Sequence, residues 1–119
     1  MIDLSRFSNL KLPGGFVVTE VVETESAMID AIGRPALAKT IIVGAQMSIV
    51  LAVEMDDVEK SISIYHEVLE GLAAATPKPP PLIIEFNEAD FEAAAISAHT
   101  RFGIADPDNV TKFLKSLGF

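Results

Sequence analysis

The chain of 119 residues contains no cysteine, which excludes disulfides, thiol chemistry and metal sites with cysteine ligands. Basic residues are also scarce. Nine Lys and Arg stand against seventeen Asp and Glu, and the net charge at pH 7 is −8. Because affinity for nucleic acids and for anionic lipid surfaces grows from Lys and Arg contacts, neither a nucleic acid nor a membrane is an expected partner.

Long hydrophobic runs are missing as well. A membrane-spanning helix needs about 20 apolar residues, whereas the longest apolar run lies between Lys39 and Glu54 and is interrupted by Gly44. The first six residues have no basic region followed by an apolar stretch, so we expect no signal peptide and a cytoplasmic location. Half of the residues are nevertheless hydrophobic, which is enough for the core of one small soluble acidic domain.

A β-hairpin is predicted in the middle of the chain. Residues 40–43 and 47–55 are typical of two strands, and Gly44-Ala45-Gln46 is typical of the turn between them. Apolar side chains alternate along the second strand, and its other face is only lightly polar. Such a strand is expected in the centre of a sheet, with both faces covered.

The hydrophobic period changes from two to about 3.6 at Asp56, which predicts a helix over residues 56–75. Asp56 and Glu59 have the spacing of a capping box, with Asp in place of the usual Ser or Thr. The proline-rich segment 77–81 ends the helix, because proline lacks the amide that the helix would need.

Weaker signals mark the remaining elements. Residues 1–15 predict an irregular arm or a single helical turn, and residues 87–119 predict a C-terminal pair of helices that start at Asn87 and Asp106. Between these ends we expect a strand over 16–24, a short helix over 26–32 with Gly33 as its C-cap, and a strand over 82–86.

This order of elements predicts a single α+β domain over residues 1–119. The first six elements follow the βαββαβ order of a ferredoxin-like sandwich, to which two C-terminal helices are added. Right-handed crossovers would place the first and third strands side by side and parallel in the middle of the sheet.

One group of side chains could carry chemistry. His66 and Glu70 lie one helical turn apart on the predicted long helix, with Glu59 two turns before them. A histidine beside carboxylates could bind a metal or act as a base. The simpler interpretation is a solvated helix edge with one favourable His–Glu pair.

His99 is a weaker candidate, on the same side of its helix as Glu88 and Glu92. The two histidines are too far apart in sequence for a zinc motif, and no serine lies in a nucleophile elbow. We therefore assign no catalytic residue, no cofactor and no metal, and the sequence favours a non-enzymatic protein while it leaves an enzyme open.

Three functions remain open. The first is a non-enzymatic, homo-oligomeric module that binds a small ligand or a protein partner. The second is a small enzyme with its site at the His66/Glu70 helix edge, and the third is an acidic, chaperone-like adaptor.

A homodimer is the expected assembly. The long helix has an apolar stripe that Ile64 and Val68 make broader than one sheet face needs, and the second helix has a stripe of small residues. A two-fold pair would cover both stripes, unless the C-terminal helices fold back over them within one chain.

Overall fold

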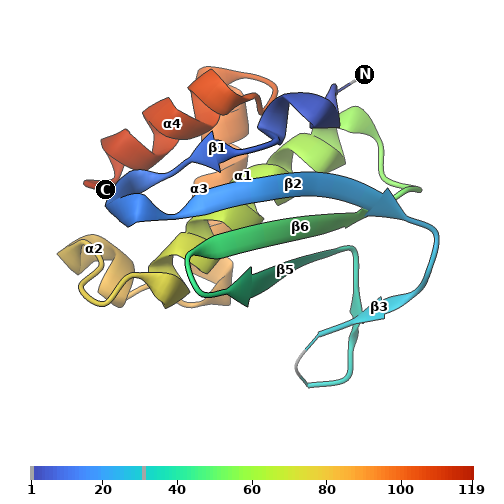
Figure 1. Ribbon diagram of the computed structural model, residues 1–119, viewed down its shortest axis with the longest axis horizontal. Helices are drawn as coiled ribbons and strands as arrows, with labels where there is room; N and C mark the ends of the chain where they lie inside the picture. Colours follow the sequence, from blue (N-terminus) through green and yellow to red (C-terminus); the bar gives the residue numbers. More distant parts are fainter. Residues whose placement is uncertain (1, 31) are drawn as a thin grey trace.

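The computed structural model describes residues 2–30 and 32–119, and it shows a mixed α+β fold with a four-stranded sheet (Figure 1). The labelled helices lie on one side of this sheet, and the side that faces the viewer in Figure 1 has none of them. In chain order the described elements are the 3-10 turn η1 (Leu4–Phe7), β1 (Leu10–Lys11), the 3-10 turn η2 (Pro13–Gly15), β2 (Val17–Thr24), β3 (Met28–Ile29), β4 (Pro35–Ala36), β5 (Ala38–Val43), β6 (Gln46–Ala52), α1 (Asp57–Ala75), α2 (Pro81–Ile84), α3 (Glu88–Phe102) and α4 (Pro107–Ser116).

The strands of the large sheet lie in the order β1-β2-β6-β5. β2 and β6 are parallel neighbours in the middle, β5 is antiparallel to β6, and β1 is antiparallel to β2. The predicted hairpin is thus confirmed, with β5 and β6 as its strands, and so is the parallel central pair.

The core lies between the sheet and α1. Met47, Ile49 and Leu51 alternate along β6 and are completely buried, as the period of two predicts. Gly71 allows the close approach of α1, because a Cβ atom there would lie only 3.1 Å from the side chain of Thr40 on β5. The second face of β6 carries no helix, and Ser48 and Val50 on it are half-buried, so this face is covered less than the sequence predicts.

The other side of α1 is covered by α3 and α4. Ile64 and Val68 of α1 are completely buried. On α3, Ala95 is completely buried and Ala98 is 2% exposed. The broad stripe on α1 therefore packs against two layers within one chain, and these two stripes are not available to a second subunit. Among the described helices, none is both long and apolar enough to cross a membrane.

The helix starts follow the sequence. Asp56 and Glu59 form the predicted capping box of α1, since the Asp56 side chain accepts from the Glu59 amide and the Glu59 side chain accepts from the Asp56 amide. Asn87 forms a second capping box at α3, and Asp106 caps α4. The N-terminal arm contains η1, β1 and η2, and Phe7 at the end of η1 is buried.

The helix predicted over residues 26–32 is wrong. Residues 28–29 form β3, which pairs with β4 in a small antiparallel hairpin. The Asp30 carboxylate accepts hydrogen bonds from the amides of Ile32 and Arg34, and Gly33 has a positive φ of 85°. These contacts form a tight loop, so Gly33 belongs to a hairpin rather than to a helix end. Ala31 lies outside the described residues.

The strand predicted over residues 82–86 is also wrong, because residues 81–84 form the short helix α2. Pro81 stands at the first helical position, where its fixed φ favours a helical start. With a hairpin at 28–36 and a helix at 81–84, the ferredoxin-like order of elements is not confirmed. The place beside β2 is taken instead by β1, from the N-terminal arm.

We predict that Gly44→Val destabilises the protein. Gly44 has a φ of 61° at the first position of the two-residue turn between β5 and β6, a conformation that costs a β-branched residue about 1 kcal/mol or more. No atom lies within 4 Å of a Cβ built there, so the cost comes from the backbone and not from a clash. Urea denaturation measures it. Gly44→Asn is the control and should lose less, because Asn tolerates positive φ; equal midpoints for all three proteins would contradict the turn.

Candidate functional site

His66 lies at the seam between α1 and α3, where its side chain leaves the hydrophobic core. Its neighbour Tyr65 points into the core, is completely buried and donates a hydrogen bond of 2.9 Å to the carbonyl oxygen of Gly103. His66 is only 8% exposed, which is unusual for a residue expected at a solvated helix edge. Such a buried polar ring needs hydrogen-bond partners.

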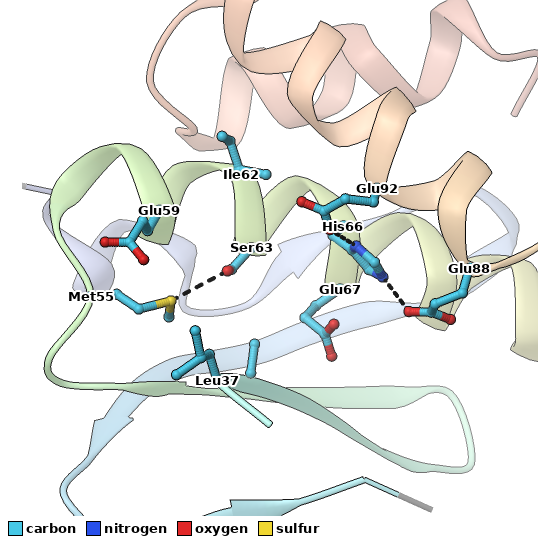
Figure 2. A pocket seen from close by; sticks show the side chains of 10 residues that line it. Leu37, Met55, Glu59, Ile62, Ser63, His66, Glu67, Glu88 and Glu92 are labelled. Atoms are coloured by element: carbon cyan, nitrogen blue, oxygen red, sulfur yellow. Dashed lines mark hydrogen bonds and ion pairs between the residues drawn. The ribbon is translucent and has the colours of Figure 1, made fainter. Parts of the chain in front are cut away.

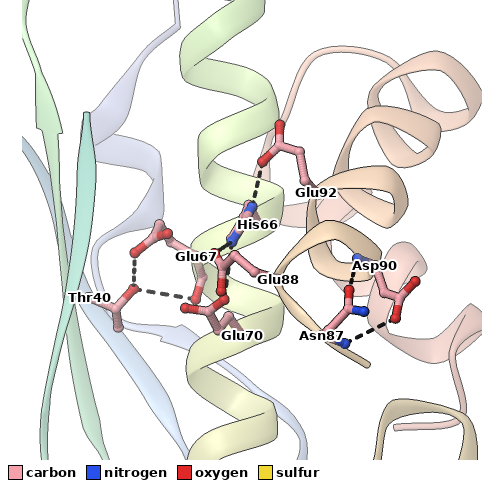
Figure 3. Close-up of polar contacts among 8 residues, drawn as sticks. All are labelled: Thr40, His66, Glu67, Glu70, Asn87, Glu88, Asp90 and Glu92. Carbon is pink, nitrogen blue, oxygen red and sulfur yellow. Dashed lines mark hydrogen bonds and ion pairs between the residues drawn. The ribbon is translucent and has the colours of Figure 1, made fainter. Parts of the chain in front are cut away.

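Three carboxylates surround the His66 ring, and two of them come from α3 (Figure 3). Glu92 Oε2 lies 2.7 Å from Nδ1, while Glu88 Oε1 and Glu70 Oε2 lie 3.0 Å and 3.2 Å from Nε2. Both ring nitrogens therefore face carboxylate oxygens. Because a carboxylate only accepts hydrogen bonds, this arrangement fits the imidazolium form, in which both nitrogens donate.

The pKa of His66 follows from the same contacts. Burial alone lowers this pKa, but the hydrogen bonds to Glu70 and Glu92, with the charges of Glu67 and Glu70, outweigh burial and raise it to about 9. His66 is thus protonated at neutral pH, and it links α1 to α3 as a cation.

The carboxylates themselves are perturbed in different directions. The hydrogen bond from His66 lowers the pKa of Glu70, whereas contact with the Glu70 carboxyl raises the pKa of Glu88. Burial raises the pKa of Glu67, although its Oε1 accepts a hydrogen bond of 2.9 Å from Thr40 on β5. Burial is thus the main cause at Glu67, whereas a neighbouring carboxyl is the main cause at Glu88, where negative charge is crowded.

A cleft of about 360 Å³ opens beside this cluster, between α1, the start of α3 and the segment before β5 (Figure 2). One part of its lining is apolar and the other is acidic. The apolar residues are Leu37, Ala38, Met55 and Ile62, and the polar ones are Glu59, Ser63, His66, Glu67, Glu88 and Glu92. The cleft can therefore hold a small group with an apolar body and a positive charge.

A second groove, of about 730 Å³, adjoins the cleft and shares Ala38, Glu67 and Glu88 with it. It runs along β5 beneath the β3–β4 hairpin, with Thr40 and Ile42 on one wall. The acidic surface thus continues from the His66 cluster to the edge of the sheet.

The structure brings three of the four predicted site residues to this region. His66 and Glu70 are in contact, and Glu59 lines the same cleft while it caps α1. His99 lies elsewhere: its Nδ1 is 2.8 Å from the Ser61 hydroxyl, whose oxygen accepts the Ala105 amide. These contacts join α1 to α3 and to the segment that follows α3, so this pair has a structural role.

Sequence reasoning missed the partners of His66. Glu88 and Glu92 were rightly placed on one side of α3 with His99, but that side faces α1. The two helices run antiparallel, so that Glu92 meets His66 and His99 meets Ser61. The sequence did contain a signal for these partners. Glu88 and Glu92 are four residues apart, on the same side of the helix as Ala95, which is buried.

Metal binding would use the same atoms. One donor atom from each of His66, Glu67 and Glu70 lies within 4.8 Å of the others, and nitrogen with carboxylate oxygen suits a divalent transition metal. A metal at the ring would have to replace a proton that the neighbouring carboxylates already hold in place. With that proton in place, both ring nitrogens of His66 already have carboxylate partners.

None of the comparisons identifies a relative: no family model matches the chain, and neither do curated proteins or solved structures. The class of the protein therefore rests on its own fold and site. It is an α+β protein whose helices cover one face of a four-stranded sheet, with an acidic cleft at the seam of α1 and α3.

We predict that His66→Gln removes a pH-dependent part of the stability. A pKa raised from the ordinary 6.5 to about 9 stabilises the folded state in full below pH 6.5, and this contribution is lost as pH rises through 9. At pH 7 the variant should lose on the order of 1 kcal/mol or more. The difference from wild type should shrink by pH 10, as urea denaturation at both pH values measures.

His99→Gln is the matched control for this experiment, because His99 lies outside the carboxylate cluster. Between pH 7 and pH 10 this variant should lose as much stability as the wild type loses. A difference between wild type and His66→Gln that stays constant over this range would contradict the cationic state of His66.

Proposed function

We propose that this protein is a non-enzymatic, homo-oligomeric binding module, and that its cleft takes a cationic group of a small ligand or of a protein partner. The observation that carries the proposal is the excess of carboxylates in the cleft. Glu59, Glu67, Glu88 and Glu92 line it, and His66 is the single cation among the lining residues. A positive ligand would relieve the contact with the Glu70 carboxyl that raises the pKa of Glu88, and it would offer a counter-charge to the buried Glu67.

The apolar side of the cleft limits the kind of cation. Leu37, Met55 and Ile62 offer no hydrogen bonds, and they favour an aliphatic stem. An ammonium or guanidinium group on a short aliphatic chain has this combination, as in a Lys or Arg side chain or in a free alkylamine. We therefore infer that charge and stem are recognised together.

The enzyme alternative has less support from this geometry. A general base must accept a proton at the working pH. Both ring nitrogens of His66 instead face carboxylate oxygens, and a pKa raised to about 9 favours a ring that already holds both protons at neutral pH. The cytoplasmic location and the single-domain organisation expected from the sequence stay predictions.

The proposal predicts that hexylammonium binds, whereas hexanol and hexanoate do not. Amide chemical shifts in NMR spectra measure the binding, and residues 37–38, 62–67 and 88–92 should respond. Binding should weaken as salt is added, because exposed charges are screened over about 10 Å at 0.1 M ionic strength. Equal shifts with hexanol would show that charge is not recognised, and no shifts with any of the three would overturn the proposal.

A variant pair locates the site. Glu88→Gln should reduce the affinity for hexylammonium severalfold, and this side chain is exposed enough to be changed without loss of the core. Asp108→Asn on α4 is the matched control, since it makes the same change of charge at an exposed position outside the cleft. Equal affinities for the two variants would place the binding elsewhere.

A further inference from the structure

β5 is an edge strand, and half of its backbone groups point away from the sheet. The Ala52 amide donates a 2.8 Å hydrogen bond to the Leu37 carbonyl, which starts the hydrogen-bonded pairs of the β5–β6 ladder. Such pairs recur at every second residue of an antiparallel ladder. Lys39, Ile41 and Val43 therefore bond to β6, and the amides and carbonyls of Ala38, Thr40 and Ile42 face the free edge.

This edge has few of the features that keep edge strands from pairing. The β5–β6 register is regular, without a bulge, and β5 contains no proline and one charged residue, Lys39. Ile41 and Val43 are 45% and 69% exposed on the uncovered face of the sheet. A regular, apolar edge of this kind is a template for another strand.

We infer that two copies of this chain pair through β5, antiparallel about a two-fold axis at Ile41, so that their two sheets become continuous. The inference deepens the homo-oligomeric part of the proposed function and does not depend on the ligand of the cleft. It also replaces the dimer surface expected from the sequence, because Ile64 and Val68 of that surface are buried within the chain.

Charge favours this register over one with its axis at Thr40, although that axis would also pair Ala38 with Ile42. Paired residues on antiparallel strands share a face, so an axis at Ile41 sets Ile41 against itself and Lys39 against Val43 of the other copy. The two lysines are then four residues apart, about 13 Å along the strand, which exceeds the screening length of about 8 Å. An axis at Thr40 would bring them to about 7 Å along the strand, on one face.

Moving the axis the other way loses backbone hydrogen bonds. With an axis at Ile42, Thr40 would pair with Gly44, which lies in the turn beyond the end of β5. With the axis at Ile41, Thr40 and Ile42 exchange hydrogen bonds on both sides of the axis. Both residues have their free amide and carbonyl at this edge, so the ladder is complete in the middle.

The β3–β4 hairpin supplies the rest of the interface. A pair of six-residue strands is only about 20 Å long. Such a short contact alone buries less surface area than a stable dimer needs. The hairpin projects past the β5 edge (Figure 1), and its residues Ile29 and Ile32 are 62% and 71% exposed. A second copy paired with β5 would lie beside this hairpin, and the two-fold axis makes the contact twice.

A charge exchange at Ile41 tests the interface and its register together. Ile41→Lys and Ile41→Glu should each be monomers, because like charges would face each other across the axis. An equimolar mixture of the two should regain the dimer mass, since opposite charges then meet. Light scattering after size exclusion, at high micromolar concentration, measures the mass of the two variants, of their mixture and of the wild type. The wild type should have twice the chain mass.

Ile96→Lys and Ile96→Glu are the controls, because Ile96 is similarly exposed on α3, away from β5. Both should stay dimeric. A monomeric wild type, or a dimeric Ile41→Lys, overturns the interface, and monomers that fail to combine in the mixture overturn the axis at Ile41. Circular dichroism confirms that the variants fold, and hexylammonium binding to Ile41→Lys reports on the cleft separately.

Discussion

A buried histidine cation joins the two halves of this molecule. His66 comes from the helix that covers the sheet, and two of its three carboxylate partners come from α3. A buried charge without partners is strongly unfavourable, whereas one with hydrogen-bonded counter-charges is tolerated. The position of α3 on α1 is thus tied to the protonation of one ring, and so is the cleft that both helices line.

Hydrophobic packing and charge have separate places in the structure. The inward faces of β6 and α1 form the core, and α3 approaches α1 through the buried Ala95 and Ala98. The acidic groups lie at the rim of this packing, where Thr40 on β5 holds Glu67 at the cleft. The cleft lies on the side of the sheet that α1 covers, whereas the free backbone groups of β5 point sideways, out of the edge of the sheet.

Much of the fold could be predicted from the sequence, because strong local signals agreed with the packing. The capping box at Asp56, the alternation from Met47 to Leu51 and the glycine of the β5–β6 turn each placed an element correctly. The errors arose in short segments. A four-residue apolar run at 81–84 is too short to show a hydrophobic period. The loop at Asp30 depends on side-chain hydrogen bonds, which the helix-like hydrophobic pattern of this segment does not indicate.

Half of the site could be predicted in the same way. His66 and Glu70 are neighbours on one helix at any packing angle, so spacing alone brings them together. Glu88 and Glu92 reach His66 only because α3 turns that side toward α1, which is decided by tertiary contacts far along the chain. For the same reason, the breadth of the α1 stripe was ambiguous: a second layer within the chain and a second subunit would bury the same residues.

The protonation state of His66 is the point from which the rest of the account follows, and nitrogen NMR of its ring measures it most directly. In protein labelled with ¹⁵N, both ring nitrogens of His66 should show the shifts of protonated imidazolium at pH 7.5 and should titrate near pH 9. His66→Gln identifies the signals by their loss. A His66 ring that is neutral at pH 7.5, with one unprotonated nitrogen and a titration near pH 6.5, would contradict the cationic link between α1 and α3.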